Sequence, residues 1–202
     1  MTKPTVLSLV LFFSILSITL ASAPRKTTAA DSSSVAAANF VKSSCSSTTY
    51  PAKCVKSLLS YAPVIKRSPA QLAQTALTVS LTSAQSTRTF VHRLTKFRGL
   101  KPREMAALRD CFQEIDDTVD RLANSVKEMR AAGSTSKGFD WHMSNVQTWV
   151  SAALTDENTC VDGFAGRALN GKMKSSIKAR IVDVAQVTSN ALALVNKYAS
   201  KP

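Results

Sequence analysis

Residues 102–133 read PREMAALRDCFQEIDDTVDRLANSVKEMRAAG and carry the clearest helical pattern in the chain. Apolar side chains recur there at alternating spacings of three and four, which is the period of one face of an α-helix. The recurring positions are Met105, Leu108, Phe112, Ile115, Val119, Leu122, Val126 and Met129. Proline at the first helical position and glycine after the last periodic residue indicate the two ends. A helix of this length must bury its apolar stripe against other elements.

Three further segments repeat this pattern. They cover about residues 69–98, 140–163 and 175–200. Ser68 is predicted to cap the first of them and Asp140 the second, because both side chains can accept a hydrogen bond from a free N–H group of the first turn. No stretch shows sustained strand alternation. The sequence therefore predicts an all-α fold in which residues 68–200 form an up-down-up-down four-helix bundle.

Residues 35–61, ahead of the bundle, hold two shorter apolar segments that predict a helical hairpin turning at residues 48–50. In an antiparallel pair of helices, two residues at one level are equally distant from the centre of the connecting loop. Cys45 and Cys54 are centred on this turn, and Cys111 and Cys160 are centred on the loop at residues 133–138. This pairing is the favoured one of three possible connectivities. A zinc site is the disfavoured alternative, since neither CxxC nor a histidine at ligand spacing is present.

The N-terminus predicts secretion. Lys3 precedes an apolar run over residues 6–20 that has the length of a signal peptide and is short for a membrane span. Residues 1–23 are therefore expected to be a cleaved signal, with the cut after Ala21 or Ala23. Residues 24–34 show no apolar periodicity and are expected to form a disordered leader, which leaves residues 35–202 as one domain. We expect an extracellular protein without a membrane anchor after cleavage, in which cysteines pair.

The chain is strongly basic. It has 26 Lys and Arg against 13 Asp and Glu, a net charge of +13, and removal of residues 1–23 takes away only Lys3 and leaves +12. Such a field favours polyanions or acidic protein faces. Five basic residues crowd the first turn of the bundle, namely Arg93, Lys96, Arg98, Lys101 and Arg103. Phe97 is the one aromatic residue among them, so a nucleic acid is disfavoured because its bases need stacking partners.

Catalytic patterns are absent from the sequence. His92 and His142 are far apart, and no GxSxG, Walker, HExxH or GxGxxG motif occurs. Four carboxylates lie close together on the helix that begins at Pro102, namely Glu114, Asp116, Asp117 and Asp120. Paired carboxylates can do acid-base chemistry, but on a long helix they are typical of a solvated face. We expect a protein that is not an enzyme and needs neither cofactor nor metal.

Two motifs resemble the plant invertase and pectin methylesterase inhibitor family. They are LKPREMAALRDC at residues 100–111 and VQTWVSAALTDENTC at residues 146–160, and they stand with a C-x8-C pair near the N-terminus. The resemblance covers about residues 35–200. It implies a secreted four-helix bundle with an N-terminal helical hairpin and two disulfides. It also implies one-to-one inhibition of a secreted plant carbohydrate-active enzyme.

The two branches of that family differ in sequence. Invertase-inhibiting members carry Pro-Lys-Phe ahead of the fourth cysteine, where this chain has Met143-Ser144-Asn145, and the similar Thr95-Lys96-Phe97 lies in another helix. The Ser-Ala-Ala stretch followed by Thr-Cys resembles the pectin methylesterase branch. By that resemblance, four polar residues are expected to face the enzyme, namely Asp117, Asp120, Ser151 and Thr159.

The expected mechanism is steric. The two helices joined by Cys111 and Cys160 would lie across the pectin-binding cleft of a methylesterase in the apoplast, without a cofactor. The alternatives are an inhibitor of cell-wall or vacuolar invertase, a wall module that binds de-esterified pectin through its basic surface, and an unassigned glycan hydrolase.

Overall fold

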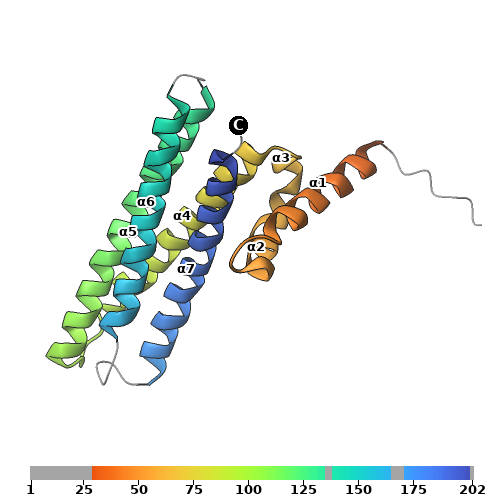
Figure 1. Cartoon of the computed structure of the whole chain (residues 1–202). Coiled ribbons are helices and arrows are strands. Elements are labelled where there is room, and N and C mark those ends of the chain that lie inside the picture. The colour runs from red at the N-terminus through yellow and green to blue at the C-terminus, as the bar shows by residue number, and fades with distance from the viewer. Residues whose placement is uncertain (1–28, 135–137, 165–170, 201–202) are drawn as a thin grey trace, which may run out of the picture.

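The computed structural model describes residues 29–134, 138–164 and 171–200, and in these ranges it consists of helices and turns without a strand. Four long helices lie antiparallel, as Figure 1 shows. They are α4 (Pro69–Leu94), α5 (Pro102–Ser134), α6 (Phe139–Gly163) and α7 (Lys172–Ala199). Each helix packs against the next, and α7 closes the ring on α4. This arrangement confirms the predicted all-α, up-down-up-down bundle.

The predicted N-terminal helical hairpin is also present, and it packs against the α4 and α7 side of the bundle (Figure 1). Its first arm is α1 (Ala29–Cys45), and its second arm is α2 (Pro51–Leu58), the 3-10 turn η1 (Leu59–Tyr61) and α3 (Ala62–Ile65). The second arm runs past the expected end at residue 61. It stops at Lys66, whose φ of 55° is left-handed and cannot continue a helix.

The hairpin also begins earlier than expected. Residues 29–34, predicted as part of a disordered leader, are helical in α1. The segment continues the helix of residues 35–45 towards the N-terminus, and it begins with two alanines, the residue of highest helix propensity. Val35, where the helix was expected to start, is 58% exposed. The remaining leader residues 24–28 and the predicted signal at residues 1–23 lie outside the described residues.

Two helix ends differ from the sequence expectation. Helix α4 ends at Leu94, so Phe97 lies in the following turn with 56% of its surface exposed instead of facing the core. The residue preceding α6 is Gly138, with φ of 82°, and Asp140 lies inside the first turn. Glycine adopts this left-handed conformation without steric cost, which allows the chain to enter α6 at that point. Asp140 still interacts favourably with the helix dipole.

The core has two parts. One joins the hairpin to the bundle and contains Val41, Leu58, Ile65, Leu72, Leu77, Ala191 and Leu194, among others. The other fills the end of the bundle near the start of α5 and contains Val91, Leu108, Ile115, Phe164, Ile177 and Ile181. The hairpin therefore shares a core with α4 and α7 and is held by more than its own short helices.

The disulfides join Cys45 to Cys54 and Cys111 to Cys160, which is the pairing that the loop centres favour. The first closes the hairpin at its turn, and the second connects α5 to α6. Among the helices of the described residues, none is long and apolar enough to cross a membrane.

Candidate functional site

Helices α5 and α6 are fixed to each other by covalent and close polar contacts. The Cα atoms of Cys111 and Cys160 are 4.3 Å apart, and both side chains are buried. Further along α5, the buried Thr118 hydroxyl lies 2.9 Å from the carbonyl oxygen of Glu114 and 3.5 Å from that of Ala153 in α6. Small side chains at these contacts let the two backbones approach closely. The pair therefore presents a rigid outer surface.

An ion pair crosses between the two helices on this surface. Arg121 Nε in α5 lies 2.5 Å from Asp156 Oδ2 in α6. Asp156 is only 7% exposed, and burial raises the pKa of its carboxyl, while the hydrogen bond from Arg121 acts in the opposite direction. The arginine thus partly compensates for burying a carboxylate at the helix interface.

Two more carboxyls of α5 lie near this ion pair. Burial raises the pKa of Glu114, and the nearby charges of Asp156 and Asp117 raise it further, against the lowering effect of Arg121. Asp117 is half-buried and accepts a hydrogen bond from Gln113 Nε2 at 3.3 Å. Three acidic side chains and one arginine therefore lie near one another, and acidic groups outnumber basic ones in the strip between the helices.

The outer surface of α6 carries a row of small hydroxyl side chains. Thr155 Oγ1 donates to the Ser151 carbonyl at 3.2 Å, and Thr159 Oγ1 donates to the Thr155 carbonyl at 2.9 Å. Their protons are used inside the helix, so the row exposes methyl groups and oxygen acceptors. Short side chains lose little conformational entropy when another surface packs on them. This row suits docking of a large, flat partner.

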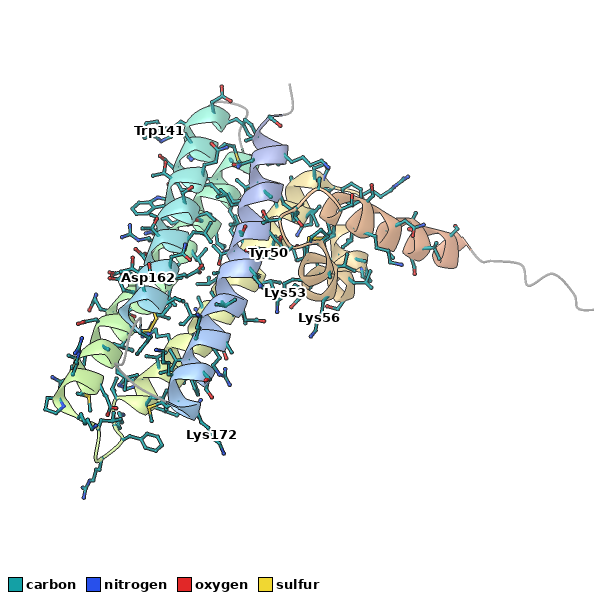
Figure 2. The ribbon with its side chains drawn as sticks, turned by 60° about the horizontal axis from the view of Figure 1, so that its bottom comes forward. Tyr50, Lys53, Lys56, Trp141, Asp162 and Lys172 are labelled. Carbon is teal, nitrogen blue, oxygen red and sulfur yellow. A yellow bond between two sulfur atoms is a disulfide. The ribbon has the colours of Figure 1, made fainter. Side chains whose placement is uncertain are left out.

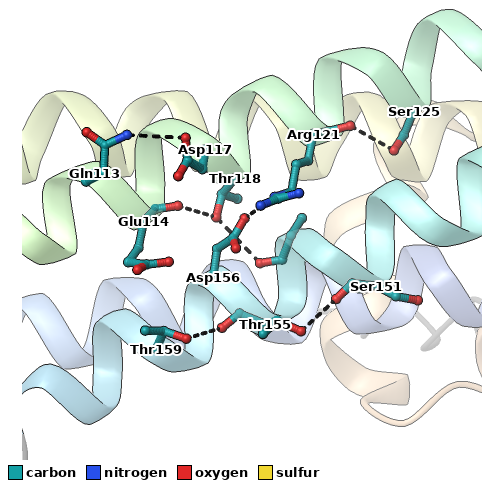
Figure 3. A network of polar contacts seen from close by, with 11 residues as sticks. Gln113, Glu114, Asp117, Thr118, Arg121, Ser125, Ser151, Thr155, Asp156 and Thr159 are labelled. Atoms are coloured by element: carbon teal, nitrogen blue, oxygen red, sulfur yellow. Dashed lines mark hydrogen bonds and ion pairs between the residues drawn. The ribbon is translucent and has the colours of Figure 1, made fainter.

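The structure brings most of the predicted partner-facing residues together. Asp117 in α5 and Ser151 and Thr159 in α6 lie on one face, with Glu114 and Asp156 between them (Figure 3). Asp120 is exposed one helical turn beyond Asp117. We call this surface the α5–α6 face. It consists of Glu114, Asp117, Asp120, Arg121, Ser151, Thr155, Asp156 and Thr159.

Sequence reasoning missed Arg121 and Asp156, which hold the centre of this face. The sequence carries a partial signal for this pair. Once the Cys111–Cys160 register is fixed, Arg121 lies on the edge of α5 that faces α6, and Asp156 lies on the edge of α6 that faces α5. Long side chains reach across more than one level, however, so the pairing does not follow from equal distance to the loop centre alone.

Acidic residues are concentrated on these two helices. Eleven of the thirteen Asp and Glu residues of the chain lie on α5 and α6, with five Lys and Arg on α5 and none on α6. The two remaining acidic residues are Asp31 and Asp183. A chain with a large positive net charge thus has one negative side, made by the same helices that carry the α5–α6 face.

The two histidines have different partners. His142 Nδ1 is 2.6 Å from Glu128 Oε2, and this hydrogen bond lowers the pKa of Glu128. The ring of His92 contacts Phe112 at 5.2 Å between centroids, and Arg88 pairs with Asp116 at 3.0 Å. Among the described residues, no group of three or more His, Cys, Asp and Glu side chains could hold a metal ion.

Comparisons with known proteins agree with this architecture. The chain is 51% identical over 194 residues to a protein named pectinesterase inhibitor 11 from Arabidopsis thaliana, covering 95% of this chain and 96% of the relative. It is 55% identical over 174 residues to the "21 kDa protein" of Daucus carota, covering 85% and 90%.

The fold is shared with a solved structure. A crystal structure of a mutant pectin methylesterase inhibitor from Arabidopsis superposes with a TM-score of 0.60 at 22% identity, over 75% of this chain and 92% of that one. The sequence model of one family, described as plant invertase/pectin methylesterase inhibitor, matches residues 39–194. The chain therefore belongs to the plant invertase/pectin methylesterase inhibitor family.

Proposed function

We propose that this protein inhibits pectin methylesterase by laying the α5–α6 face across the enzyme's pectin-binding cleft in a one-to-one complex. The observation that carries the proposal is the acidic, disulfide-fixed strip formed by Glu114, Asp117 and Asp156, in which Arg121 pairs with Asp156. A cleft that holds a polyuronate must attract carboxylates, so a negative protein surface complements it. Relatives that are 51% and 55% identical carry the name pectinesterase inhibitor, which supports the choice of enzyme.

Rigidity contributes to the proposed mechanism. A preformed surface loses little conformational entropy on docking. Its affinity for the enzyme therefore depends on how well the two surfaces fit, because little free energy is spent on ordering the interface. The Cys111–Cys160 bond and the packing of Thr118 against Ala153 supply this rigidity on the α5–α6 face.

Invertase is the disfavoured alternative target. The positions that match the family's Pro-Lys-Phe motif hold Met143, Ser144 and Asn145, and Met143 is 2% exposed in the bundle core. A side chain in that place is not available to enter a sugar site. The segment at the start of α6 therefore supports a partner other than invertase.

The test is a titration of the purified chain from residue 24 against one plant pectin methylesterase and one cell-wall invertase. We expect stoichiometric loss of methylesterase activity at one inhibitor per enzyme and unchanged invertase activity. Inhibition of invertase alone would refute the proposal. The protein assayed by itself on pectin shows whether it hydrolyses glycans.

We further propose that the protein is secreted to the plant cell wall. The apolar run at residues 6–20 and two disulfides are typical of a secreted protein. N-terminal sequencing of the protein recovered from apoplastic fluid would test this, with a start near residue 22 or 24 expected.

A further inference from the structure

The side of the bundle opposite the α5–α6 face is formed by α4 and α7, and the hairpin covers only part of it. A cavity of about 610 Å³ lies between these two helices beside the hairpin. We call it the α4–α7 groove. Tyr61 from η1 contributes to its wall, α4 contributes Thr82, Ser83 and Ser86, and α7 contributes Arg180 and Asp183. The lining thus combines an aromatic ring, hydroxyl groups and charged side chains.

Arg180 is held in place by an aromatic ring. Its Cζ atom lies over the ring of Phe90 in α4, 4.3 Å from the ring centroid. Stacking of this kind orients the guanidinium plane and leaves the N–H groups along its edge for a planar anion. A carboxylate is such an anion, because it can accept two parallel hydrogen bonds from arginine.

The surroundings of the groove are positive. Helix α4 contains two arginines and no acidic residue, and α7 contains five Lys and Arg against Asp183 alone. Asp183 is itself ion-paired with Lys53 of the hairpin. Figure 2 shows Lys53 and Lys56 on the hairpin beside α7 and Lys172 at the other end of α7. An anionic chain lying along this side would therefore meet cations beyond the groove.

Tyr61 adds a feature that a plain ionic surface lacks. Its side chain is 44% exposed at the edge of the groove. An aromatic ring can cover the apolar face of a sugar ring, whereas Ser and Thr hydroxyls and a carboxylate can bond its hydroxyl groups. A small inorganic anion would use Arg180 but would gain nothing from Tyr61.

We propose that the α4–α7 groove binds a segment of an acidic polysaccharide built of uronic acid residues. A carboxylate of the chain pairs with Arg180, the neighbouring sugar hydroxyls bond the α4 hydroxyl side chains and Asp183, and one sugar ring packs on Tyr61. Charge complementarity along α7 favours this occupant. The inference does not depend on the proposed inhibition, because it uses the other side of the bundle.

The experiment is calorimetric titration of the chain from residue 24 with low-ester polygalacturonate. Arg180→Gln and Tyr61→Ala are compared with Arg109→Gln, a matched loss of one exposed charge on α5. Loss of a charge-assisted hydrogen bond predicts about tenfold weaker binding for Arg180→Gln. The control should change binding by less than about twofold, since it removes only long-range attraction.

Two further polymers distinguish recognition of uronic acid residues from general attraction of a polyanion. Fully methyl-esterified pectin should bind weakly because it lacks free carboxylates, and poly-L-glutamate, which has carboxylates but no sugar rings, should be insensitive to Tyr61→Ala. Equal weakening by Arg180→Gln and Arg109→Gln, or equal affinity for esterified and de-esterified polymer, would overturn the proposal. Groove variants should keep methylesterase inhibition, and Asp117→Lys should keep polygalacturonate binding, so failure of one proposal is distinguishable from failure of the other.

Discussion

The side-chain amide of Asn190 in α7 is hydrogen-bonded in both directions to the main chain of Tyr50, at the turn of the N-terminal hairpin. Asn190 Oδ1 accepts from the Tyr50 N–H at 2.9 Å, and Asn190 Nδ2 donates to the Tyr50 carbonyl at 2.9 Å. Asn190 is buried and Tyr50 is partly exposed, so both bonds are partly shielded from water. One side chain thus connects two residues that are 140 positions apart in the sequence.

Replacement of Asn190 should loosen the hairpin. Asn190→Leu keeps the approximate volume but removes both bonds. The Tyr50 carbonyl keeps the hydrogen bond from the Cys54 N–H, whereas the Tyr50 N–H loses its partner, and this should cost about 2 kcal/mol of unfolding free energy. Urea unfolding measures this loss, and hydrogen exchange should accelerate first in residues 35–61. Asn124→Ala, at an exposed position of α5, is the control and should stay within about 0.5 kcal/mol. Unchanged exchange in the hairpin would contradict the role of Asn190.

The buried Glu157 predicts a stability that falls as pH rises. Burial raises its pKa from 4.5 to about 8. The Thr188 hydroxyl donates a hydrogen bond to Oε1 at 2.9 Å, which lowers the pKa but does not offset the effect of burial. Within the described part of the chain, Oε2 has no hydrogen-bond partner. The folded state holds the proton more tightly than the unfolded state, so stability is greatest below about pH 4.5 and declines up to about pH 8.

The size of this effect can be measured by difference. Between pH 5 and pH 8 the Glu157 carboxyl alone should reduce the unfolding free energy by roughly 3 kcal/mol. Glu157→Gln removes the titration, and the wild-type minus variant difference should therefore become smaller as pH rises. A difference that stays constant from pH 5 to pH 8 would show that the carboxyl is ionised in the folded protein at both values.

Substitutions on the α5–α6 face should weaken inhibition without unfolding the protein. Asp117→Lys reverses a charge in the acidic strip, and Thr159→Trp places a large ring on the flat row of α6. Each should reduce affinity for pectin methylesterase by at least about 1.4 kcal/mol, which is tenfold. Inhibition constants measure the effect, and circular dichroism checks the fold.

A matched control is available on α4. Thr78 is exposed, and its hydroxyl donates to the Gln74 carbonyl at 2.9 Å, the same arrangement as in Thr159. Thr78→Trp should leave inhibition unchanged. If Asp117→Lys and Thr159→Trp inhibit as well as the parent protein, the enzyme-binding surface lies elsewhere, whatever the family.

The two disulfides should differ in what they contribute. Cys111 and Cys160 are 49 residues apart and Cys45 and Cys54 only nine, so the longer loop restricts the unfolded chain more. Loop entropy predicts a loss of about 4 kcal/mol for the Cys111→Ala/Cys160→Ala double variant and about 3 kcal/mol for the hairpin pair. Urea unfolding of both double variants tests the order, and a larger loss for the hairpin pair would contradict it.

Local pattern predicted most of the fold. The three-four alternation from Met105 to Met129 marked α5 correctly, because a stripe of this length specifies both the helix and its buried side. The predicted capping residue of α6 was wrong. Asp140 is a good cap by residue type, but Gly138 has the backbone freedom that the turn requires. The Asn190–Tyr50 contact had no local signal at all.

The candidate site was predictable only in outline. The register set by Cys111 and Cys160 brought α5 and α6 together, and the family resemblance indicated Asp117 and Thr159. The Arg121–Asp156 ion pair depends on how long side chains cross a helix interface, which period and spacing do not encode. Burial of Glu157 likewise depends on the packing of α7, since its neighbours in sequence are polar.

The segregation of charge makes the molecule an electric dipole across its width. Acidic residues lie on α5 and α6, and α4, α7 and the hairpin are basic. Near a negatively charged polymer, a torque turns the basic side towards the polymer and the acidic side away from it. The interaction acts within about 10 Å at moderate ionic strength. An adsorbed molecule would therefore stand with α5 and α6 facing the open solution, oriented before any partner arrives.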